Sequence, residues 1–143
     1  MFSPAELAAR LEAAAADIPA ALLAPTTEFV ELAEHTAAKA IGTYEFGWPP
    51  LADSTMDDRT RQGYAPNEPL LRTGELRSSI HSIAAVTGMG AEGLVYSPDQ
   101  IAVYQEMGTA TIPPRSFLYE SLVRTIPALG RLFGPVALRL LSS

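Results

Sequence analysis

Two histidines, His35 and His81, are the side chains best suited to acid–base chemistry or metal binding near neutral pH. They do not stand at HxxxH or HxH spacing, so a metal site would need further ligands from scattered carboxylates. The simpler interpretation of each is an exposed or hydrogen-bonded histidine. An acid–base hydrolase that uses His81 with an Asp or Glu stays open as an alternative function.

A group of carboxylates, Asp53, Asp57 and Asp58, also has the residue types for acid–base work. These residues lie at an expected helix start, where acidic side chains interact favourably with exposed backbone N–H groups, and capping is the favoured explanation. No GxSxG, Walker or GxGxxG motif occurs, and Gly88-Met89-Gly90 fits a hairpin turn. The absence of Cys excludes thiol nucleophiles and thiolate metal sites. We therefore expect a protein that is not an enzyme and needs no metal or cofactor.

The arginines are more informative because several lie in or beside loops and short helix starts. From such positions a guanidinium can reach carboxylates of another subunit, although a local acidic partner is an equally simple explanation for each one. Tryptophan, tyrosine and arginine are the residues enriched at interface hot spots. The set consists of Arg59, Arg61, Arg72, Arg77 and Arg115, together with Trp48, Tyr64 and Tyr104.

The N-terminal elements expected to support these residues are two helices. Ser3, Pro4 and Glu6 form a helix start with an N-cap, a first-turn proline and a capping box, and the apolar spacing predicts a helix over residues 4–18 that Pro19 ends or bends. A second helix is expected from about residue 26 to Ile41, with Thr26 or Thr27 as its cap and Gly42 at its stop. Residues 1–42 are thus predicted to form a helical hairpin.

The rest of the chain mixes short helices with a strand pair. Alternating apolar residues suggest a short strand over 44–48, and the capping-box pattern at Ser54 predicts a helix over 54–61. Further helices are expected after Thr73, over 100–107 and from residue 116 to 143 with kinks at Pro127 and Pro135, and strands over 79–87 and 93–97. The expected fold class is α+β: one domain over 1–143 in which the hairpin and a long C-terminal helix pack on a small, mainly antiparallel sheet.

Composition narrows the kinds of partner. The 143 residues suit a single domain, and the formal net charge of −6 with scattered basic residues argues against DNA as a direct ligand. Hydrophobic residues make up 48% and charged residues 18% of the chain, which suggests that partners cover part of the surface. We expect no signal peptide and no transmembrane helix.

An ordered series of motifs runs from Trp48 to about Leu122. It comprises Trp48-Pro49-Pro50-Leu51, the Ser54-Thr55 helix start, Pro69-Leu70-Leu71-Arg72-Thr73-Gly74-Glu75-Leu76-Arg77-Ser78-Ser79-Ile80, Tyr104-Gln105-Glu106-Met107-Gly108 and Ile112-Pro113-Pro114-Arg115-Ser116-Phe117-Leu118. In order and spacing the series resembles the bacteriophage virion-morphogenesis (tail-completion) family, which includes the corresponding protein of phage Mu. Residues 43–122 would form the family-like core, and the first 42 residues carry no part of the resemblance.

The resemblance implies a structural virion protein at the head–tail junction, or neck, of a tailed phage, prophage or gene transfer agent. It implies a ring of copies of this chain, with a hexamer as the expected number, made in the host cytoplasm. The expected neighbours are adjacent neck and tail proteins: a connector or stopper, a tail terminator and the tail tube. DNA would pass nearby without specific binding, and no membrane would be involved. A tail terminator or a connector stopper is the alternative. The residues expected to form the interface or its frame are Trp48, Pro49, Pro50, Leu51, Arg59, Arg61, Leu71, Arg72, Thr73, Gly74, Leu76, Arg77, Tyr104, Glu106, Gly108, Pro114, Arg115 and Phe117. Gly74 is expected either to adopt a backbone conformation that is hard for other residues or to meet a close neighbour.

Overall fold

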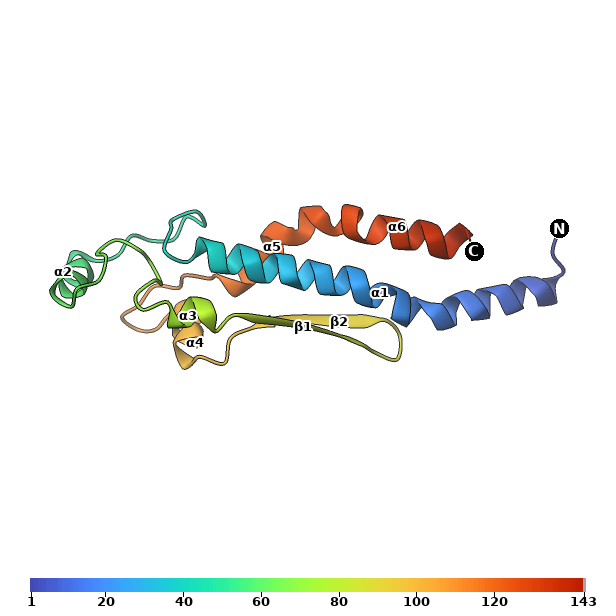
Figure 1. Cartoon of the computed structure of the whole chain (residues 1–143), viewed down its shortest axis with the longest axis horizontal. Coiled ribbons are helices and arrows are strands. Elements are labelled where there is room, and N and C mark those ends of the chain that lie inside the picture. The colour runs from blue at the N-terminus through green and yellow to red at the C-terminus, as the bar shows by residue number, and fades with distance from the viewer. Residues whose placement is uncertain (143) are drawn as a thin grey trace.

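The computed structural model describes residues 1–142 and has the predicted α+β class, with a long N-terminal helix, a two-stranded antiparallel sheet and a long C-terminal helix. The elongated molecule carries α2 and its flanking loops at one end and the N-terminus at the other (Figure 1). The elements in chain order are α1 (Pro4–Ala40), α2 (Asp53–Arg61), α3 (Glu75–Ser78), β1 (His81–Val86), β2 (Ala91–Tyr96), α4 (Gln100–Met107), α5 (Leu118–Thr125), the 3₁₀ turn η1 (Ile126–Ala128) and α6 (Leu129–Ser142).

The predicted N-terminal hairpin is wrong, because α1 is one continuous helix that passes through Pro19 and Pro25. A proline removes one backbone donor and crowds the preceding turn, but its fixed φ angle is itself helical, so packing on both sides can hold the helix together. Pro25 is buried in that packing. Thr27 does not cap a second helix; its hydroxyl donates to the Leu23 carbonyl oxygen at 2.8 Å within the same helix. The predicted helix start at Ser3 is confirmed, with both halves of the capping box formed.

Helix α1 is the centre of the fold, with the β1–β2 hairpin along one side and α5 and α6 along the other (Figure 1). Its C-terminal half supplies much of the core through small residues, among them the fully buried Ala33, Ala37 and Ala40. Small side chains let neighbouring backbones approach closely. A Cβ atom on Gly93 of β2 would lie 2.4 Å from Cγ1 of Val30, so the strand passes the helix at a distance that only glycine allows.

The sheet consists of the predicted hairpin alone. Its register pairs His81 with Tyr96 and Val86 with Ala91 across an antiparallel ladder. Because side chains alternate along a strand, one face packs on α1 and the other is left uncovered. On the outer face the directly paired Ile83 and Leu94 are more than half exposed.

Three other predictions need correction or refinement. Residues 44–48 form turns rather than a strand, because Gly47 has a positive φ of 70° and its N–H donates to the Tyr44 carbonyl. Helix α2 begins at Asp53 after Ala52 and has no side-chain cap, so the capping box expected at Ser54 is absent. The C-terminal helix is interrupted at Pro127 by η1, as expected, but it continues through Pro135. The last residue predicted for this helix, 143, lies outside the described residues.

Candidate functional site

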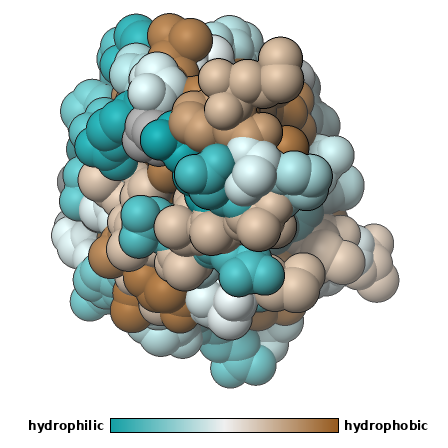
Figure 2. Space-filling model, turned by 90° about the vertical axis from the view of Figure 1, so that its right-hand side faces the viewer, coloured by the Kyte–Doolittle hydropathy of each residue, from teal (hydrophilic) through white to brown (hydrophobic). Residues whose placement is uncertain are grey.

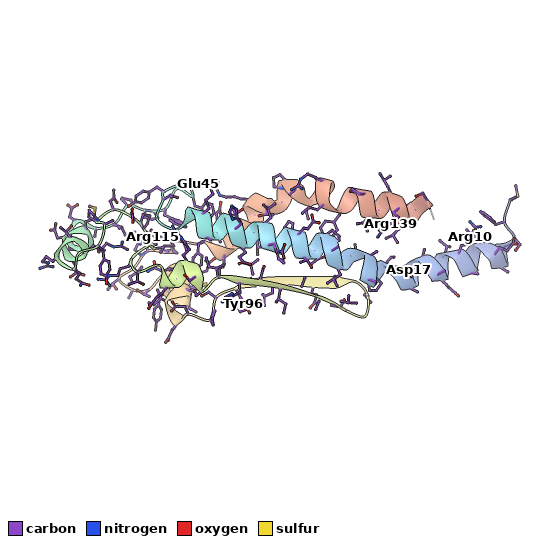
Figure 3. All side chains as sticks on the ribbon, in the orientation of Figure 1. Arg10, Asp17, Glu45, Tyr96, Arg115 and Arg139 are labelled. Atoms are coloured by element: carbon purple, nitrogen blue, oxygen red, sulfur yellow. The ribbon has the colours of Figure 1, made fainter. Side chains whose placement is uncertain are left out.

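The motif residues gather at the end of the molecule opposite the N-terminus, in a connected region that we call the loop frame: residues 42–80 together with 104–118. Arg115 joins its two parts and is only 5% exposed. Its Nε and Nη2 donate to the Pro49 carbonyl oxygen at 3.1 and 3.0 Å, and Nη2 also donates to the Pro50 carbonyl at 3.1 Å. Figure 3 shows Arg115 among the loops at this end. The guanidinium thus holds a proline-rich loop whose backbone lacks its own donors.

Arg59 holds the loop that follows α2 through its backbone carbonyls, as Arg115 holds the Pro49–Pro50 loop. It is 9% exposed, and its Nη1 donates to the carbonyl oxygens of Glu68 at 2.9 Å and Leu71 at 2.6 Å. Arg77 reaches back to the end of α1, where Nη2 donates to the Ile41 carbonyl at 2.5 Å. These three arginines bind backbone of their own chain. Arg59 and Arg115 are buried in doing so, whereas Arg77 stays exposed.

Burial lowers the pKa of Arg59 and of Arg115, since removing a guanidinium from water disfavours its charged form. Arginine titrates so far above neutrality that both stay charged at physiological pH. Each buried charge is compensated by carbonyl dipoles, and this arrangement fixes the loops in place.

Trp48 is the aromatic link between the two parts of the frame. It is 8% exposed, and its indole Nε1 donates to the Ser116 carbonyl oxygen at 2.9 Å. Phe46 packs edge-on against it with ring centroids 5.5 Å apart, and the Arg124 guanidinium lies 4.5 Å from the Phe46 ring centroid. The fully buried Phe117 belongs to the same core cluster. Trp48 therefore supports the frame from inside.

Glu106, at the end of α4, binds the start of helix α5. It accepts hydrogen bonds from the backbone N–H groups of Phe117, Leu118 and Tyr119 at 2.8, 3.0 and 3.0 Å. It also accepts one from the Ser116 hydroxyl at 2.6 Å. These backbone donors at the start of α5 have no partner within the helix, so Glu106 is a remote N-terminal cap.

Two motif glycines of the frame adopt positive φ angles in the left-handed region, as do Gly42, Gly47 and Gly63. Gly108 has φ of 75°, and an added Cβ would lie 2.9 Å from the backbone nitrogen of Pro114. Gly74 has φ of 90°, which confirms the expectation of a conformation that is hard for other residues. Nothing lies within 4 Å of a Cβ added to Gly74, so it is conformation and not crowding that favours glycine there.

The remaining predicted residues are divided between the interior and the surface of the frame. Leu51 and Leu76 are buried, and Leu71 is partly buried against the core. The exposed members are Pro49, Pro50, Arg61, Arg72, Thr73, Arg77, Tyr104 and Pro114. Only these can contact a partner without rearrangement of the chain.

A cleft of about 450 Å³ opens between α2, α3 and α4 beside these exposed residues. Arg72 lines it, with its guanidinium 5.1 Å from the Tyr64 ring centroid and within 3.3 Å of the Asp58 carboxylate. The cleft floor includes Gln105, whose buried side-chain oxygen has no hydrogen-bond partner within residues 1–142. Charged, aromatic and amide groups thus line one cleft, and this combination suits the binding of a loop from a partner protein.

The two histidines, distant in sequence, line one shallow depression on the α1–β1 side together with Glu31, Glu34 and Ser82. The Ser82 hydroxyl donates to the Glu34 carboxylate. Within the part of the chain that the structure describes, no hydrogen bond joins either imidazole to Ser82 or to a carboxylate. The depression thus brings His81 near two carboxylates, as an acid–base hydrolase would need, but without a hydrogen bond between them.

Sequence reasoning missed Tyr44. Its hydroxyl donates to the Asn67 side-chain oxygen at 2.6 Å and accepts from the Leu51 backbone N–H at 3.2 Å, so it ties the first loop of the frame to the second. Its place in an apparent strand alternation gave no signal of this role, because only the fold brings the two loops together.

Within residues 1–142, no group of three or more His, Asp or Glu side chains is placed to hold a metal ion. The same residues include no helix with both the length and the apolar character needed to span a bilayer. No protein-family model, curated protein or solved structure matches the chain.

Proposed function

We propose that this chain is a structural virion protein that joins head and tail at the neck of a tailed phage, prophage or gene transfer agent, where it acts in a ring through protein–protein contacts. The observation that carries the proposal is the frame itself. The motifs that resemble the tail-completion family are far apart in sequence, yet they bind one another: Arg115 holds the Pro49–Pro50 loop, Trp48 binds the Ser116 carbonyl, and Glu106 caps α5.

A rigid frame suits an assembly protein. Loops that are already ordered lose little conformational entropy on binding, and repetition of the subunit in a ring multiplies modest contacts. The rim of the frame supplies exposed Arg61, Arg72 and Tyr104 for such contacts. Large apolar side chains are also exposed elsewhere, including Ile83 on the sheet and Tyr119 on α5. Exposed apolar surface on this scale is typical of a subunit whose faces are covered in an assembly.

A tail terminator or connector stopper fits the same features and is the second candidate. An acid–base hydrolase using His81 has less support, because within residues 1–142 no hydrogen bond joins the His81 imidazole to Glu31 or Glu34, the carboxylates that share its depression. The net charge of −6 suits a protein past which DNA moves without being bound.

The test is genetic and structural. Particles produced without this chain should accumulate as separate heads and tails, and the wild-type chain supplied in trans should restore joining. R72E, which alters an exposed residue of the rim, should reduce joining, whereas H81A should not. Cryo-electron microscopy of the restored particles should place a ring of the chain between head and tail. Joined, infectious particles formed in the absence of the chain would refute the proposal, and loss of function in H81A alone would favour the hydrolase.

A further inference from the structure

We call the N-terminal part of α1, residues 1–17, the arm. Its last residue, Asp17, lines a depression with Arg139 and Leu140 of α6, and the preceding residues extend past the rest of the molecule (Figure 1). The arm continues beyond the tip of the β1–β2 hairpin and beyond the C-terminal end of α6 (Figure 1). Residues 1–13 are all exposed, and their side chains contact one another: Ser3 and Glu6 form the capping box, and the Arg10 guanidinium stacks 3.9 Å from the Phe2 ring centroid. At 1.5 Å per residue the helical portion projects roughly 20 Å.

The arm carries an apolar stripe that is left uncovered. Leu7 and Leu11 recur at helical spacing with Ile18, and the same stripe leads to Ala33 and Ala40, which the rest of the chain buries completely. In the arm the leucines are 49% and 62% exposed. The face that forms the core at one end of α1 is thus present at the other end without a cover.

Helix α6 has a second uncovered face at the same end of the molecule. Leu132 packs inward, and on the opposite side Leu138 and Leu141 are 70% and 86% exposed. Gly130 and Gly134 share this outward face, and nothing lies within 4 Å of a Cβ added at either position. Glycine weakens a helix interior, and no close contact within residues 1–142 accounts for these two. The end-on view in Figure 2 shows apolar side chains interspersed with polar ones at this end.

The arm and helix α6 carry charges of opposite sign. The arm's side chains include Glu6, Glu12 and Asp17 against a single Arg10, whereas α6 has Arg131 and Arg139 and no acidic residue. Asp17 and Arg139 line one depression within the chain, so Glu6, Glu12 and Arg131 are the charges that face a second copy. None of the acids of the arm and neither arginine of α6 forms an ion pair within residues 1–142. Figure 3 shows Arg10 and Asp17 on α1 and Arg139 on α6. An acidic, leucine-bearing helix and a basic, leucine-bearing helix are complementary.

We propose that the arm of one copy docks along the outward face of α6 of a second copy. The arm cannot reach its own outward α6 face, because it belongs to the same continuous helix as the rest of α1 and its N-terminal end points away from the body (Figure 1). Since the arm and the α6 face are different surfaces, the contact is head-to-tail, and repetition closes a ring when the rotation between copies permits it. This inference rests on the proposed function in one respect: the head-to-tail contact is the one that would build the proposed ring.

The first experiment measures the mass of the purified full-length chain by sedimentation velocity over a range of concentrations. The wild-type chain should self-associate. L7E/L11E in the arm and L138E/L141E in α6 should each weaken association by about ten- to hundredfold per leucine, because each buried leucine is worth that much in affinity. A9E/A16E places the same charges on the other side of the arm and is the matched control, which should associate like the wild type. A monomeric wild-type chain, or L7E/L11E with unchanged mass, would overturn the proposal.

The second experiment identifies the contact. The chain has no Cys, so introduced thiols report on one pair of sites at a time. Protein carrying Leu11→Cys, mixed with protein carrying Leu138→Cys and oxidised, should give the mixed disulfide in excess over either symmetric one. A predominant disulfide between two Leu11→Cys chains would mean that arms pair with each other, and this proposal would fail. G134A provides a further check, since it should raise the thermal midpoint of the monomer and still weaken association.

The outcomes separate this inference from the proposed function. A ring that forms normally in L7E/L11E refutes the arm contact and leaves the neck role standing. Particles that join without the chain refute the neck role, whatever the purified chain does.

Discussion

Replacement of Glu106 by glutamine tests whether this side chain stabilises the loop frame as a cap. The wild-type carboxylate accepts from three backbone N–H groups at the start of α5 and from the Ser116 hydroxyl. Glutamine keeps the shape but has one acceptor oxygen instead of two and no charge. Its NH₂ group would face backbone donors, and a donor left without a partner costs about 1–3 kcal/mol. Loss of the charge at the helix N-terminus adds about 0.3–1 kcal/mol.

We therefore expect E106Q to lower the free energy of unfolding by about 2–3 kcal/mol. The matched control is E120Q, because within residues 1–142 the Glu120 carboxylate pairs only with Arg124, at 3.0 Å on the surface of α5. Exposed pairs of this kind contribute about 0.5 kcal/mol. Because Glu120 stands in the first turn of α5, E120Q also loses a charge interaction of about 0.3–1 kcal/mol with the helix N-terminus, so the difference between the two variants reports the backbone hydrogen bonds. Urea unfolding followed by circular dichroism gives both values, and it should be repeated at several protein concentrations because assembly adds apparent stability. Equal losses in E106Q and E120Q would refute the capping role.

Three further predictions follow from the packing. G93A should destabilise the fold by about 1–3 kcal/mol, because its Cβ would lie 2.4 Å from Val30, while G88A, which meets no neighbour, should be close to neutral in the same thermal melt. G74V should lower the free energy of unfolding in urea by about 1–2 kcal/mol, because the φ of 90° at this position is unfavourable for a β-branched residue. Normal stability and normal particle joining in G74V would contradict this. R115K should lower the free energy of unfolding by about 1.5–3 kcal/mol, because an ammonium cannot reproduce the paired hydrogen bonds of the guanidinium to the proline carbonyls. Unchanged stability in R115K would show that these hydrogen bonds are unimportant.

The stability of the arm's helix start should depend on pH. The backbone hydrogen bond from Ser3 lowers the pKa of Glu6 below the usual value for glutamate. A carboxylate whose pKa is lower in the folded state stabilises that state at pH values above its unfolded pKa, and the contribution is lost as pH falls through the folded pKa. The protection of the Ser3 and Glu6 amides against hydrogen exchange, measured relative to the intrinsic exchange rate at each pH, should therefore fall in acid, and E6Q should remove this dependence. Identical pH profiles for the wild type and E6Q would contradict it.

Much of the local structure could be predicted from the sequence, because local signals decide it. Ser3 and Glu6 fixed the start of α1, Asp99 and Gly108 bounded α4, and the glycine-rich turn predicted the hairpin. The prolines of α1 were misleading for a physical reason. Pro19 and Pro25 each weaken a helix locally, but the packing of the hairpin and of α5 and α6 against α1 favours one continuous helix.

The roles of the motif residues were decided by the tertiary structure. A guanidinium beside a loop looks the same in sequence whether it faces a partner or its own backbone, and only the fold brings Arg115 to the Pro49 carbonyl and Glu106 to the start of α5. The same holds for the arm: its apolar stripe is plain in the sequence, but its exposure depends on where the hairpin and α6 end. The sequence by itself determined which side chains are apolar, charged or able to cap, since these are local chemical properties. Which of them are buried, which are paired and which remain exposed was settled only by long-range packing.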